Sequence, residues 1–502
     1  MNHFSGLFLP SVSKVLLALI LMLVSVSPAT GLAFQRYYHQ PTQVIPSYAS
    51  PTLQVKPQPA IQNKPQPAIQ NLPPGATTRV LPDGRIAIVT PFSKEKIREL
   101  KRREAERLRI RKTRTQELTK QGKNKSLFPR LPGEFEKTKA IILSICDWQP
   151  HNFDVLIDLI EKTRGHANLL LLYNDDLKSG DKDSFSELLK KLLRTGKDYR
   201  HIRFLNSNLD TIWLRDFGPR LIETEDGTAM VLDFFYDAAR QQDDLFPKGW
   251  ANRTGAPRNL VPWSLQGGNL LANGRGLAIA TTRLFEDNRL SRPGKDYLQD
   301  EAYVKQQFMQ FCNIKELALL KPLEQEVTRH VDMFATFLAK DLVLVAQLDP
   351  KLDPQNASIL NDNAKLLSRV KVDGRPLRVE RVWIPPRRIQ HWSTYTNIIL
   401  TDRLVLIPTY QSDPPAYLRE ATKTYRRLLP KHSVKTIDMS LMDRLGGSLH
   451  CLSCPIPSFA KLPPKTLTFQ EAVAKQNLRP ARKRKKPNQG QRKPTNLKPA
   501  YN

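Results

Sequence analysis

Cysteine is scarce in this chain, which has four in 502 residues. Small secreted domains that are held together by disulfides need many more, so this class of protein is excluded. Long hydrophobic runs are scarce too, because only one run, near the N-terminus, is long enough to bear on a membrane. A protein with several membrane-spanning helices is therefore excluded. The apolar fraction of 40% is ordinary for a globular protein.

Acidic residues are few relative to basic ones, with 48 Asp and Glu against 78 Lys and Arg and a formal net charge of +30. Residues 475–502 contain ten basic residues and no acidic ones, and residues 94–125 contain fourteen basic and five acidic residues. The central part, 126–474, is nearly balanced. The high charge therefore describes the flanks, and it does not make the core a nucleic-acid-binding protein.

The N-terminal hydrophobic run, 15–26, follows Lys14 and is followed by Pro28 and small residues. This pattern predicts an export signal over residues 1–33, cleaved after Ala33, because small residues stand at the −3 and −1 positions. The run is shorter than the roughly 20 residues of a membrane-spanning helix. An uncleaved anchor is the alternative. Either way we expect an exported protein, located in the periplasm, in the cell envelope or outside the cell.

Four further regions are predicted along the chain. Residues 34–78 are rich in Pro and Gln, contain the repeat KPQPAIQN at 56–63 and 64–71, and indicate a semi-rigid linker. Residues 79–126 begin with a predicted hairpin around Asp83-Gly84 and continue as a basic helix, which is either solvated or lies on an anionic surface. The predicted catalytic domain covers 127–467, and a basic disordered tail covers 468–502.

Strand-like and helix-like patterns alternate in the predicted domain, which indicates an α/β fold. The predicted strands are 140–146, 168–173, 202–205, 230–235, 277–282, 342–347, 379–384 and 404–408. The predicted helices are 153–162, 184–194, 297–311, 358–367 and 416–429.

Polar clusters occur where loops leave these apolar strands, the usual place for chemistry. They are Asp210–Pro219 (DTIWLRDFGP), Gln266–Asn269 (QGGN), His330–Asp332 (HVD) and Gly446–Cys451 (GGSLHC). Each has an ordinary structural explanation, since Cys and Trp are usually core residues and a His-x-Asp pair is often on the surface. Together they offer a thiolate nucleophile, a base, two carboxylates and an aromatic face.

Cys451 and Cys454 also form a C-x-x-C pattern. A structural zinc site needs four ligands, and the chain has no second C-x-x-C pair. A thioredoxin-like redox pair is an alternative, although its place near the end of the core is unusual for one. Whether the two cysteines form a disulfide after export stays open.

The order of these clusters resembles the agmatine deiminase and bacterial-type peptidylarginine deiminase family, of the guanidino-group-modifying (pentein) superfamily. The resemblance covers residues 127–459, about two-thirds of the chain. The segments that carry it are Trp213–Pro219 (W-x-R-D-F-G-P), Gly267-Gly268-Asn269, His330-Val331-Asp332, Tyr395-Thr396-Asn397, and Gly446-Gly447 followed by His450-Cys451. It implies a five-bladed α/β-propeller built from ββαβ modules, and hydrolysis of a guanidinium to a ureido group with loss of ammonia. No metal or organic cofactor is implied.

The resemblance also implies a role for each site residue. Asp216 and Asp332 would hold the planar cation by bidentate hydrogen bonds. Cys451 would attack its central carbon as a thiolate, forming a thiouronium intermediate. His330 would protonate the departing ammonia and then activate water. Trp213 would stack on the guanidinium, a contact of about 0.5–2 kcal/mol.

Substrate-side positions are further implied at Arg215, Asn269 and Asn397, of which Asn397 either contacts substrate or orients its loop. Two residues depart from the family pattern. Arg329 stands where a Gly usually precedes the catalytic His, and a cation there would perturb His330 or face the substrate mouth. Gln266 stands where the family has Glu, which removes a negative charge.

Two substrates fit this chemistry. Peptidyl-arginine or a C-terminal arginine, converted to citrulline, suits an exported enzyme; agmatine, converted to N-carbamoylputrescine for putrescine biosynthesis, suits the family's largest group. A different class is a non-catalytic cationic protein whose flanks bind an anionic envelope polymer or phospholipid. Nucleic acid is not expected as the main partner, because few aromatic residues accompany the basic flanks. The sequence does not predict the oligomeric state.

Overall fold

The computed structural model describes residues 77–80, 86–89, 109, 130–146, 153–174, 181–237, 239–289, 297–388, 392–443 and 445–478. The chain divides into two compact units, Met1–Gly122 and Lys123–Asn502. The predicted export signal lies outside the described residues. So do the predicted linker up to residue 76, the basic helix apart from residue 109, and the tail beyond residue 478.

The first unit contains the predicted hairpin. Strand β1 (Thr77–Val80) pairs antiparallel with β2 (Ile86–Val89), with Val80 opposite Ile86. The sequence between them contains Asp83-Gly84, a dipeptide that is typical of tight turns. This confirms the hairpin predicted from the alternation around that dipeptide.

The second unit is built from mixed sheets. The strand orders of the five larger sheets are β6-β7-β8, β9-β10-β11, β12-β13-β16, β17-β18-β19 and β20-β3-β4-β5-β21, and a small ribbon is β14-β15. The bounds of the strands are β3 Thr138–Ser144, β4 Leu169–Tyr173, β5 Ile202–Asn206, β6 Arg220–Glu223, β7 Ala229–Phe235, β8 Arg258–Ser264, β9 Leu271–Ala272, β10 Leu277–Thr281, β11 Glu316–Leu320, β12 Ala335–Ala339, β13 Leu342–Gln347, β14 Lys371–Val372, β15 Arg375–Pro376, β16 Arg378–Trp383, β17 Ile399–Leu400, β18 Leu404–Thr409, β19 Ser433–Asp438, β20 Ser453–Pro457 and β21 Leu467–Thr468.

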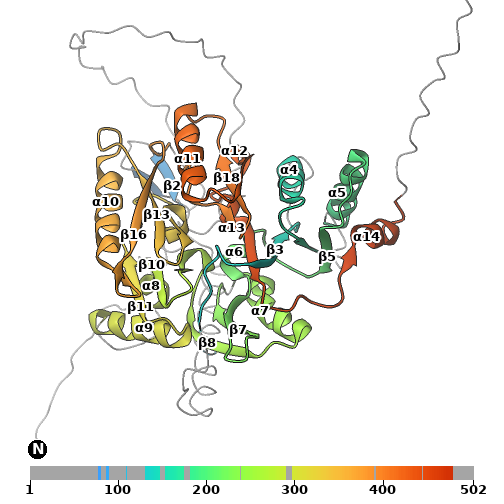
Figure 1. Cartoon of the computed structure of the whole chain (residues 1–502), viewed down its shortest axis with the longest axis horizontal. Coiled ribbons are helices and arrows are strands. Elements are labelled where there is room, and N and C mark those ends of the chain that lie inside the picture. Colours follow the sequence, from blue (N-terminus) through green and yellow to red (C-terminus); the bar gives the residue numbers. More distant parts are fainter. Residues whose placement is uncertain are drawn as a thin grey trace, which may run out of the picture. The chain divides into compact units, whose positions relative to one another are not determined.

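Helices connect and cover these sheets. Their bounds are α4 Phe153–Thr163, α5 Asp181–Thr195, α6 Leu214–Phe217, α7 Gln241–Thr254, α8 Arg283–Arg289, α9 Tyr297–Phe311, α10 Pro354–Arg369, α11 Pro415–Leu428, α12 Ser440–Asp443, α13 Leu449–Leu452 and α14 Phe469–Lys475, with two 3-10 helices, η3 Gly267–Asn269 and η4 Val331–Met333. Figure 1 shows α10 lying along β13 and β16, and α4 and α5 beside β3 and β5. None of the described helices is long and apolar enough to cross a membrane.

Each larger sheet repeats one plan. In the sheet of β6, β7 and β8, the first two strands pair antiparallel, and helix α7 then carries the chain back so that β8 pairs parallel with β7. A parallel pair needs such a crossover, whereas an antiparallel pair needs only a short turn. Strands β12 and β13, helix α10 and strand β16 repeat the plan. The unit is therefore a propeller-like α/β fold of ββαβ units.

The predicted strands and helices of this unit are found with small shifts in their ends. Strand β4 (LLLLY) is buried along its whole length, which explains why its apolar run is continuous. Helix α10 begins earlier than predicted because Asp353 caps it, accepting a hydrogen bond from the backbone of Asn356, and Pro354 suits the first turn. The short inner strands β9 and β17, two residues each, are too short to be predicted.

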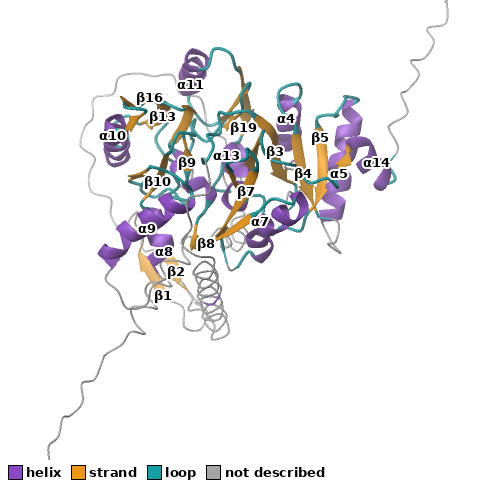
Figure 2. Ribbon diagram, turned by 60° about the horizontal axis from the view of Figure 1, so that its bottom comes forward, coloured by secondary structure: helices purple, strands orange, loops and turns teal. Residues whose placement is uncertain are grey.

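The predicted start of the disordered tail at residue 468 is wrong. Thr468 and Glu471 form a reciprocal capping box that starts helix α14, and Phe469 and Ala472 are buried. Strand β21 before it pairs with β5, and Figure 2 shows α14 beside β5 at one side of the unit. The predicted tail can begin only beyond these anchored residues.

Candidate active site

Five polar segments lie immediately before the first strand of the five larger sheets. Helix α6 leads into β6, η3 into β9, η4 into β12, residues 394–397 into β17, and α13 into β20. Because the sheets repeat one plan, these segments fall at equivalent places in the fold, and neighbouring pairs α13–α6, α6–η3 and η3–η4 are in contact. The repeat thus brings together motifs that are more than two hundred residues apart in the sequence.

Cys451 lies on α13 and is 6% exposed. The side-chain nitrogen of Asn397 is 3.4 Å from its Sγ, and the Asn397 oxygen accepts hydrogen bonds from the backbone N–H of His450 at 2.9 Å and of Cys451 at 3.4 Å. Asn397 therefore orients the loop that carries the cysteine. Burial, with the charges of Asp332 and Asp216, raises the pKa of the Cys451 thiol well above its usual value. In the free protein the sulfur is therefore protonated.

The two predicted carboxylates lie near this sulfur. Oδ1 of Asp216 accepts a hydrogen bond from the backbone of Gly268 at 3.3 Å, and burial together with the charge of Asp332 raises the pKa of Asp216 to about 7. Asp332 is 1% exposed, and its Oδ1 has no hydrogen-bond partner among the described residues. A buried oxygen without a donor is costly, so a cationic ligand that supplies N–H groups would be stabilised here.

Gly268 explains how these groups approach one another. A Cβ at this position would lie 2.7 Å from Nδ1 of His330, 2.9 Å from Oδ2 of Asp332 and 3.2 Å from Oδ1 of Asp216. Any side chain would push apart the imidazole and both carboxylates. The glycine pair of the predicted cluster thus has a steric reason.

His330 is buried and faces Asp216. Its Nδ1 is 3.7 Å from Oδ1 of Asp216, and its Nε2 is 2.8 Å from Oε1 of Gln266. Burial, with the positive charges of Arg283 and His450, lowers the pKa of His330 well below its usual value. The imidazole is therefore neutral, and an amide oxygen at Nε2 favours the tautomer with its proton on that nitrogen.

Arg329, which departs from the family pattern, is held by two acidic residues. Arg329 has φ of 57°, the left-handed region that favours glycine, and its guanidinium forms a bidentate pair with Glu286 at 2.5 and 2.9 Å. Its backbone N–H is also bonded to Glu326. The Arg329 charge is thereby matched by Glu286, and its effect on His330 or on the substrate stays a prediction.

Sequence reasoning missed Glu134, which lies in the loop before β3. Its Oε2 is 2.7 Å from Nε2 of His450, and its two oxygens accept from Arg215 at 2.5 and 3.4 Å. His450 in turn lies 2.7 Å from Oδ2 of Asp332 through its Nδ1. No motif surrounds Glu134 in the sequence, so only its contacts reveal it. The guanidinium of Arg215 donates to Glu134 and to the backbone oxygen of His450. A contact between Arg215 and substrate stays a prediction.

Trp213 and Asn269 are placed differently from each other. Trp213 is half-buried, and its ring packs so closely on Gly447 that a Cβ there would overlap it. Asn269 is buried, and its side-chain oxygen accepts from the backbone of Thr281 at 2.9 Å and of Val331 at 3.2 Å. Asn269 thus joins η3 to β10 and η4, and a substrate contact of either residue stays a prediction.

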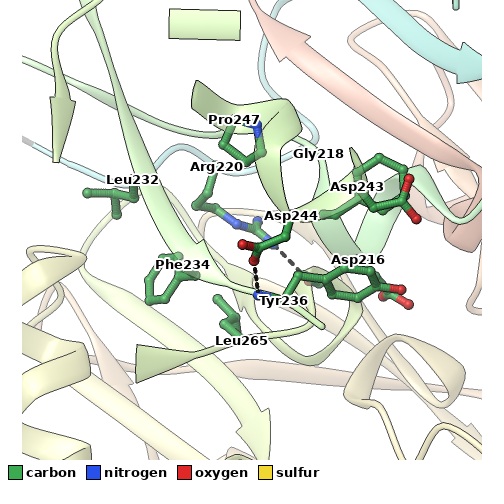
Figure 3. Close-up of a pocket in the computed structure, with 12 residues that line it drawn as sticks. Asp216, Gly218, Arg220, Leu232, Phe234, Tyr236, Asp243, Asp244, Pro247 and Leu265 are labelled. Atoms are coloured by element: carbon green, nitrogen blue, oxygen red, sulfur yellow. Dashed lines mark hydrogen bonds between the residues drawn. The ribbon is translucent and has the colours of Figure 1, made fainter. Parts of the chain in front are cut away.

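A small cavity lies beside Asp216. Its lining includes Arg220, Tyr236, Asp243 and Asp244, and Figure 3 shows Asp244 held against the backbone of Tyr236, a hydrogen bond of 2.7 Å. Cys451, His330 and Asp332 are not among its lining residues. Of the four residues assigned to the chemistry, the cavity is therefore lined only by Asp216, whose side chain is 16% exposed.

Other expectations concern metals and disulfides. Within the described part of the chain, no group of three or more His, Cys, Asp and Glu is arranged to hold a metal ion. Cys451 and Cys454 are both free thiols in this structure, and Cys454 lies in β20 with its Sγ against Gly218. Whether they pair after export stays a question for experiment.

Comparisons with known proteins support the fold of this unit. The chain is 23% identical over 297 to 300 residues to relatives that include an agmatine deiminase of Stutzerimonas stutzeri, where the match spans 53% of this chain and 79% of the relative. The solved agmatine deiminase of Enterococcus faecalis superposes with a TM-score of 0.55 at 17% identity, over 66% of this chain and 96% of the other. The solved agmatine deiminase of C. jejuni gives a TM-score of 0.53 at 18% identity, over 66% of this chain and 96% of the other.

These structural likenesses establish the propeller-like α/β fold of the deiminases. The model of the family described as Porphyromonas-type peptidyl-arginine deiminase matches residues 130–457, more than half of the chain. The match begins at the strand partner of β6 and ends with β20, so it includes every segment that meets at the site. The chain therefore belongs to the Porphyromonas-type peptidyl-arginine deiminase family, and it is a hydrolase that acts on carbon–nitrogen bonds of amidines.

Proposed function

We propose that this protein is an exported deiminase that converts the guanidino group of an arginine peptide to a ureido group, with loss of ammonia. The observation that carries the proposal is the pair of Asp216 and Asp332 beside the Cys451 thiol. Asp332 keeps one buried oxygen without a donor, and burial together with the charge of Asp332 raises the pKa of Asp216, so ionising both carboxylates is costly. A planar cation with several N–H groups would donate a hydrogen bond to the Asp332 oxygen and would lower the pKa of Asp216.

Binding of the substrate prepares the nucleophile. The guanidinium between the two carboxylates offsets the charges that raise the pKa of Cys451, so thiolate forms more easily in the complex than in the free protein. Neutral His330 accepts the thiol proton. The sulfur then forms a bond to the central carbon of the guanidinium, and the positive charge on nitrogen is neutralised in a tetrahedral intermediate.

The leaving group and water complete the reaction. Protonated His330 transfers its proton to one amino group, the C–N bond breaks, ammonia leaves, and a cationic thiouronium remains on Cys451. His330, neutral again, removes a proton from the attacking water. The C–S bond then breaks as the hydroxyl proton passes to the sulfur, the product carries a neutral ureido group, and protonated His330 releases its proton to solvent, which returns it to the neutral form. One water is consumed and one ammonia is released in each turnover.

Two arginine side chains near Asp216 support arginine over agmatine as the substrate. Arg240 and Arg283 lie close enough to Asp216 to lower its pKa, which nonetheless stays raised, and both are half-buried. Agmatine carries a second ammonium at its far end, and cationic neighbours would repel it. A C-terminal arginine carries a carboxylate there, which guanidinium groups bind well. A peptide that ends in arginine is therefore the substrate we favour.

Two finer features belong to the same proposal. We infer that the five mixed sheets are the five blades of a propeller, because each repeats the ββαβ plan and each contributes one segment to the site. Export is supported by the N-terminal hydrophobic run and small residues around Ala33. Sequencing the N-terminus of the mature protein tests export, and a chain that still begins at Met1 would reject cleavage.

The experiment that tests the function is a ureido assay on the mature protein. We expect kcat/KM to be larger for a peptide ending in arginine than for agmatine, with ammonia released in equal amount to the ureido product. Arg240→Leu should reduce that preference if the carboxylate meets Arg240. A large preference for agmatine would overturn the substrate assignment, and no ureido product from any guanidino compound would overturn the function.

A further inference from the structure

We propose that Glu134 and His450 are positioning residues that hold one oxygen of Asp332 and leave its other oxygen for the guanidinium. Glu134 lies in the loop before the first strand of the unit, and His450 precedes the nucleophile, so the pair joins the two ends of the domain. Neither residue reaches the reacting atoms in the mechanism above. The kinetic part of this inference depends on the proposed function, whereas the charge state of His450 does not.

The geometry is a chain of alternating charges. Arg215 donates to Glu134 at 2.5 Å, Glu134 meets Nε2 of His450 at 2.7 Å, and Nδ1 of His450 meets Oδ2 of Asp332 at 2.7 Å. The side chains of Arg215 and His450 are 3% and 5% exposed, and that of Glu134 is 22% exposed. With carboxylates on both ring nitrogens, both nitrogens must carry protons for both contacts to be hydrogen bonds. The arrangement therefore assigns His450 a positive charge.

The electrostatics of the surroundings agree with that charge. Burial and the nearby Arg215 act against protonation of His450, but the charge of Glu134 and the hydrogen bonds with Asp332 and Glu134 outweigh them and raise the pKa of His450. Burial acts against ionisation of Glu134, but Arg215 and His450 outweigh it and lower the pKa of Glu134. Arg220, on β6, also contributes to that lowering. Two cations and two anions thus alternate within one cluster.

The consequence concerns the two oxygens of Asp332. Oδ2 is held by His450, which leaves Oδ1 as the oxygen that a substrate can meet. If His450 were neutral, the carboxylates of Glu134 and Asp332 would lie on either side of it without a positive charge between them. One of these carboxylates would then bind a proton instead of a cation. Glu134 prevents this by favouring the charged imidazole. We therefore assign the effect of the pair to substrate binding more than to bond breaking.

The first test is kinetic and uses Glu134→Gln, with Glu136→Gln as the matched control. Glu136 lies in the same loop but pairs with Arg130 at 2.5 Å, outside the cluster. We expect Glu134→Gln to raise KM for the arginine peptide by about 10- to 100-fold, with a smaller change in kcat, and the control to change neither by more than about twofold. An unchanged KM in a folded Glu134→Gln protein would overturn the proposal.

The pH profile gives a readout that a merely structural role would not move. The protonated form of His450 is the competent one, so activity is retained below its raised pKa and is lost as pH rises through that pKa. Removing the charge of Glu134 lowers this pKa, and the alkaline limb of kcat/KM should move to lower pH. His450→Gln should abolish that His450-dependent limb. An alkaline limb that is the same in the wild type and both variants would overturn the proposal.

The second test does not require turnover. Histidine-labelled NMR of the full-length wild-type protein at pH 7 should show His450 with both ring nitrogens protonated, assigned by loss of its signal in His450→Gln. Glu134→Gln should lower the titration midpoint. A neutral His450 in the wild type overturns the proposal even if Glu134→Gln fails to fold. A charged His450 in a protein that deiminates nothing supports the positioning cluster and rejects only the proposed reaction.

Discussion

Two histidines flank the pair of carboxylates, and their surroundings give them opposite charge states. His330 has an amide, Gln266, on one nitrogen and Asp216 at 3.7 Å from the other, and its pKa is lowered. His450 has a carboxylate at 2.7 Å from each nitrogen, and its pKa is raised. Both are buried, so burial alone does not decide the outcome. The difference teaches that the partner at hydrogen-bond distance assigns one imidazole to proton transfer and the other to charge compensation.

The contrast between His330 and His450 has a catalytic meaning only if Cys451 is the nucleophile. Cys451→Ala is therefore the most severe test. We expect kcat/KM for ureido formation to fall by about 10⁴-fold or more, because no covalent intermediate can form. Circular dichroism should be unchanged, since alanine fits the same space. Retained turnover in Cys451→Ala would reject the thiouronium route.

Asp216→Asn removes the carboxylate that faces His330, and we expect kcat/KM to fall by about 100-fold or more, because a buried partner of the cation is lost. In the wild type the pKa of Asp216 is about 7 before substrate binds, and the ionised form is the one that binds a guanidinium. Wild-type kcat/KM should therefore rise with pH up to about 7, on the acidic side of the alkaline limb that His450 sets. The variant should lack this acidic limb, and an identical limb in Asp216→Asn would assign it to another group.

Gln266→Glu gives His330 a carboxylate partner at Nε2, as His450 has. A carboxylate 2.8 Å from Nε2 would stabilise the imidazolium, so we expect the pKa of His330 to rise. Neutral His330 accepts the thiol proton, so its titration gives an acidic limb in the pH profile of kcat/KM. That limb should shift to higher pH in Gln266→Glu. Gln266→Leu serves as the uncharged control and should not shift it upward. The result is read from pH profiles of all three proteins.

Arg329→Gly is expected to have the smallest effect, and it tests whether the charge next to His330 matters. The Glu286 ion pair is half-exposed and stabilises little, while glycine relieves the left-handed φ of 57°. We expect the free energy of unfolding to change by less than about 1 kcal/mol, measured by denaturant titration. A large shift of the acidic limb of kcat/KM that is assigned to His330 would show that the charge of Arg329 affects the pKa of His330.

Much of the fold follows from local sequence patterns. The continuous apolar run at β4 and the amphipathic run at α4 both require burial, and both were predicted within a few residues of their observed ends. Strands β9 and β17 could not be predicted, because a two-residue strand carries no periodicity and exists only through its neighbour. Helix α14 was not predicted, because the basic residues that follow it in the sequence favoured a disordered tail and the capping box of Thr468 and Glu471 was overlooked.

The candidate site shows the same division. Cys451, Asp332 and Asp216 stand in compact motifs, so a resemblance in the sequence was enough to select them. Glu134 stands in no motif, and it acquires its place from a contact with His450, 316 residues away. Gln266 and Arg329 were recognised as departures, but their effects depend on which atoms they face: Gln266 meets His330, and Arg329 meets Glu286.

By itself the sequence determined the residue types that can do the chemistry and the alternation of strands and helices, because both are written in short local patterns. Only the tertiary structure decided the protonation of the two histidines and the free oxygen of Asp332. Those properties are set by distances between groups on different ββαβ units, and electrostatic interactions in a buried site depend on such distances far more than on order along the chain.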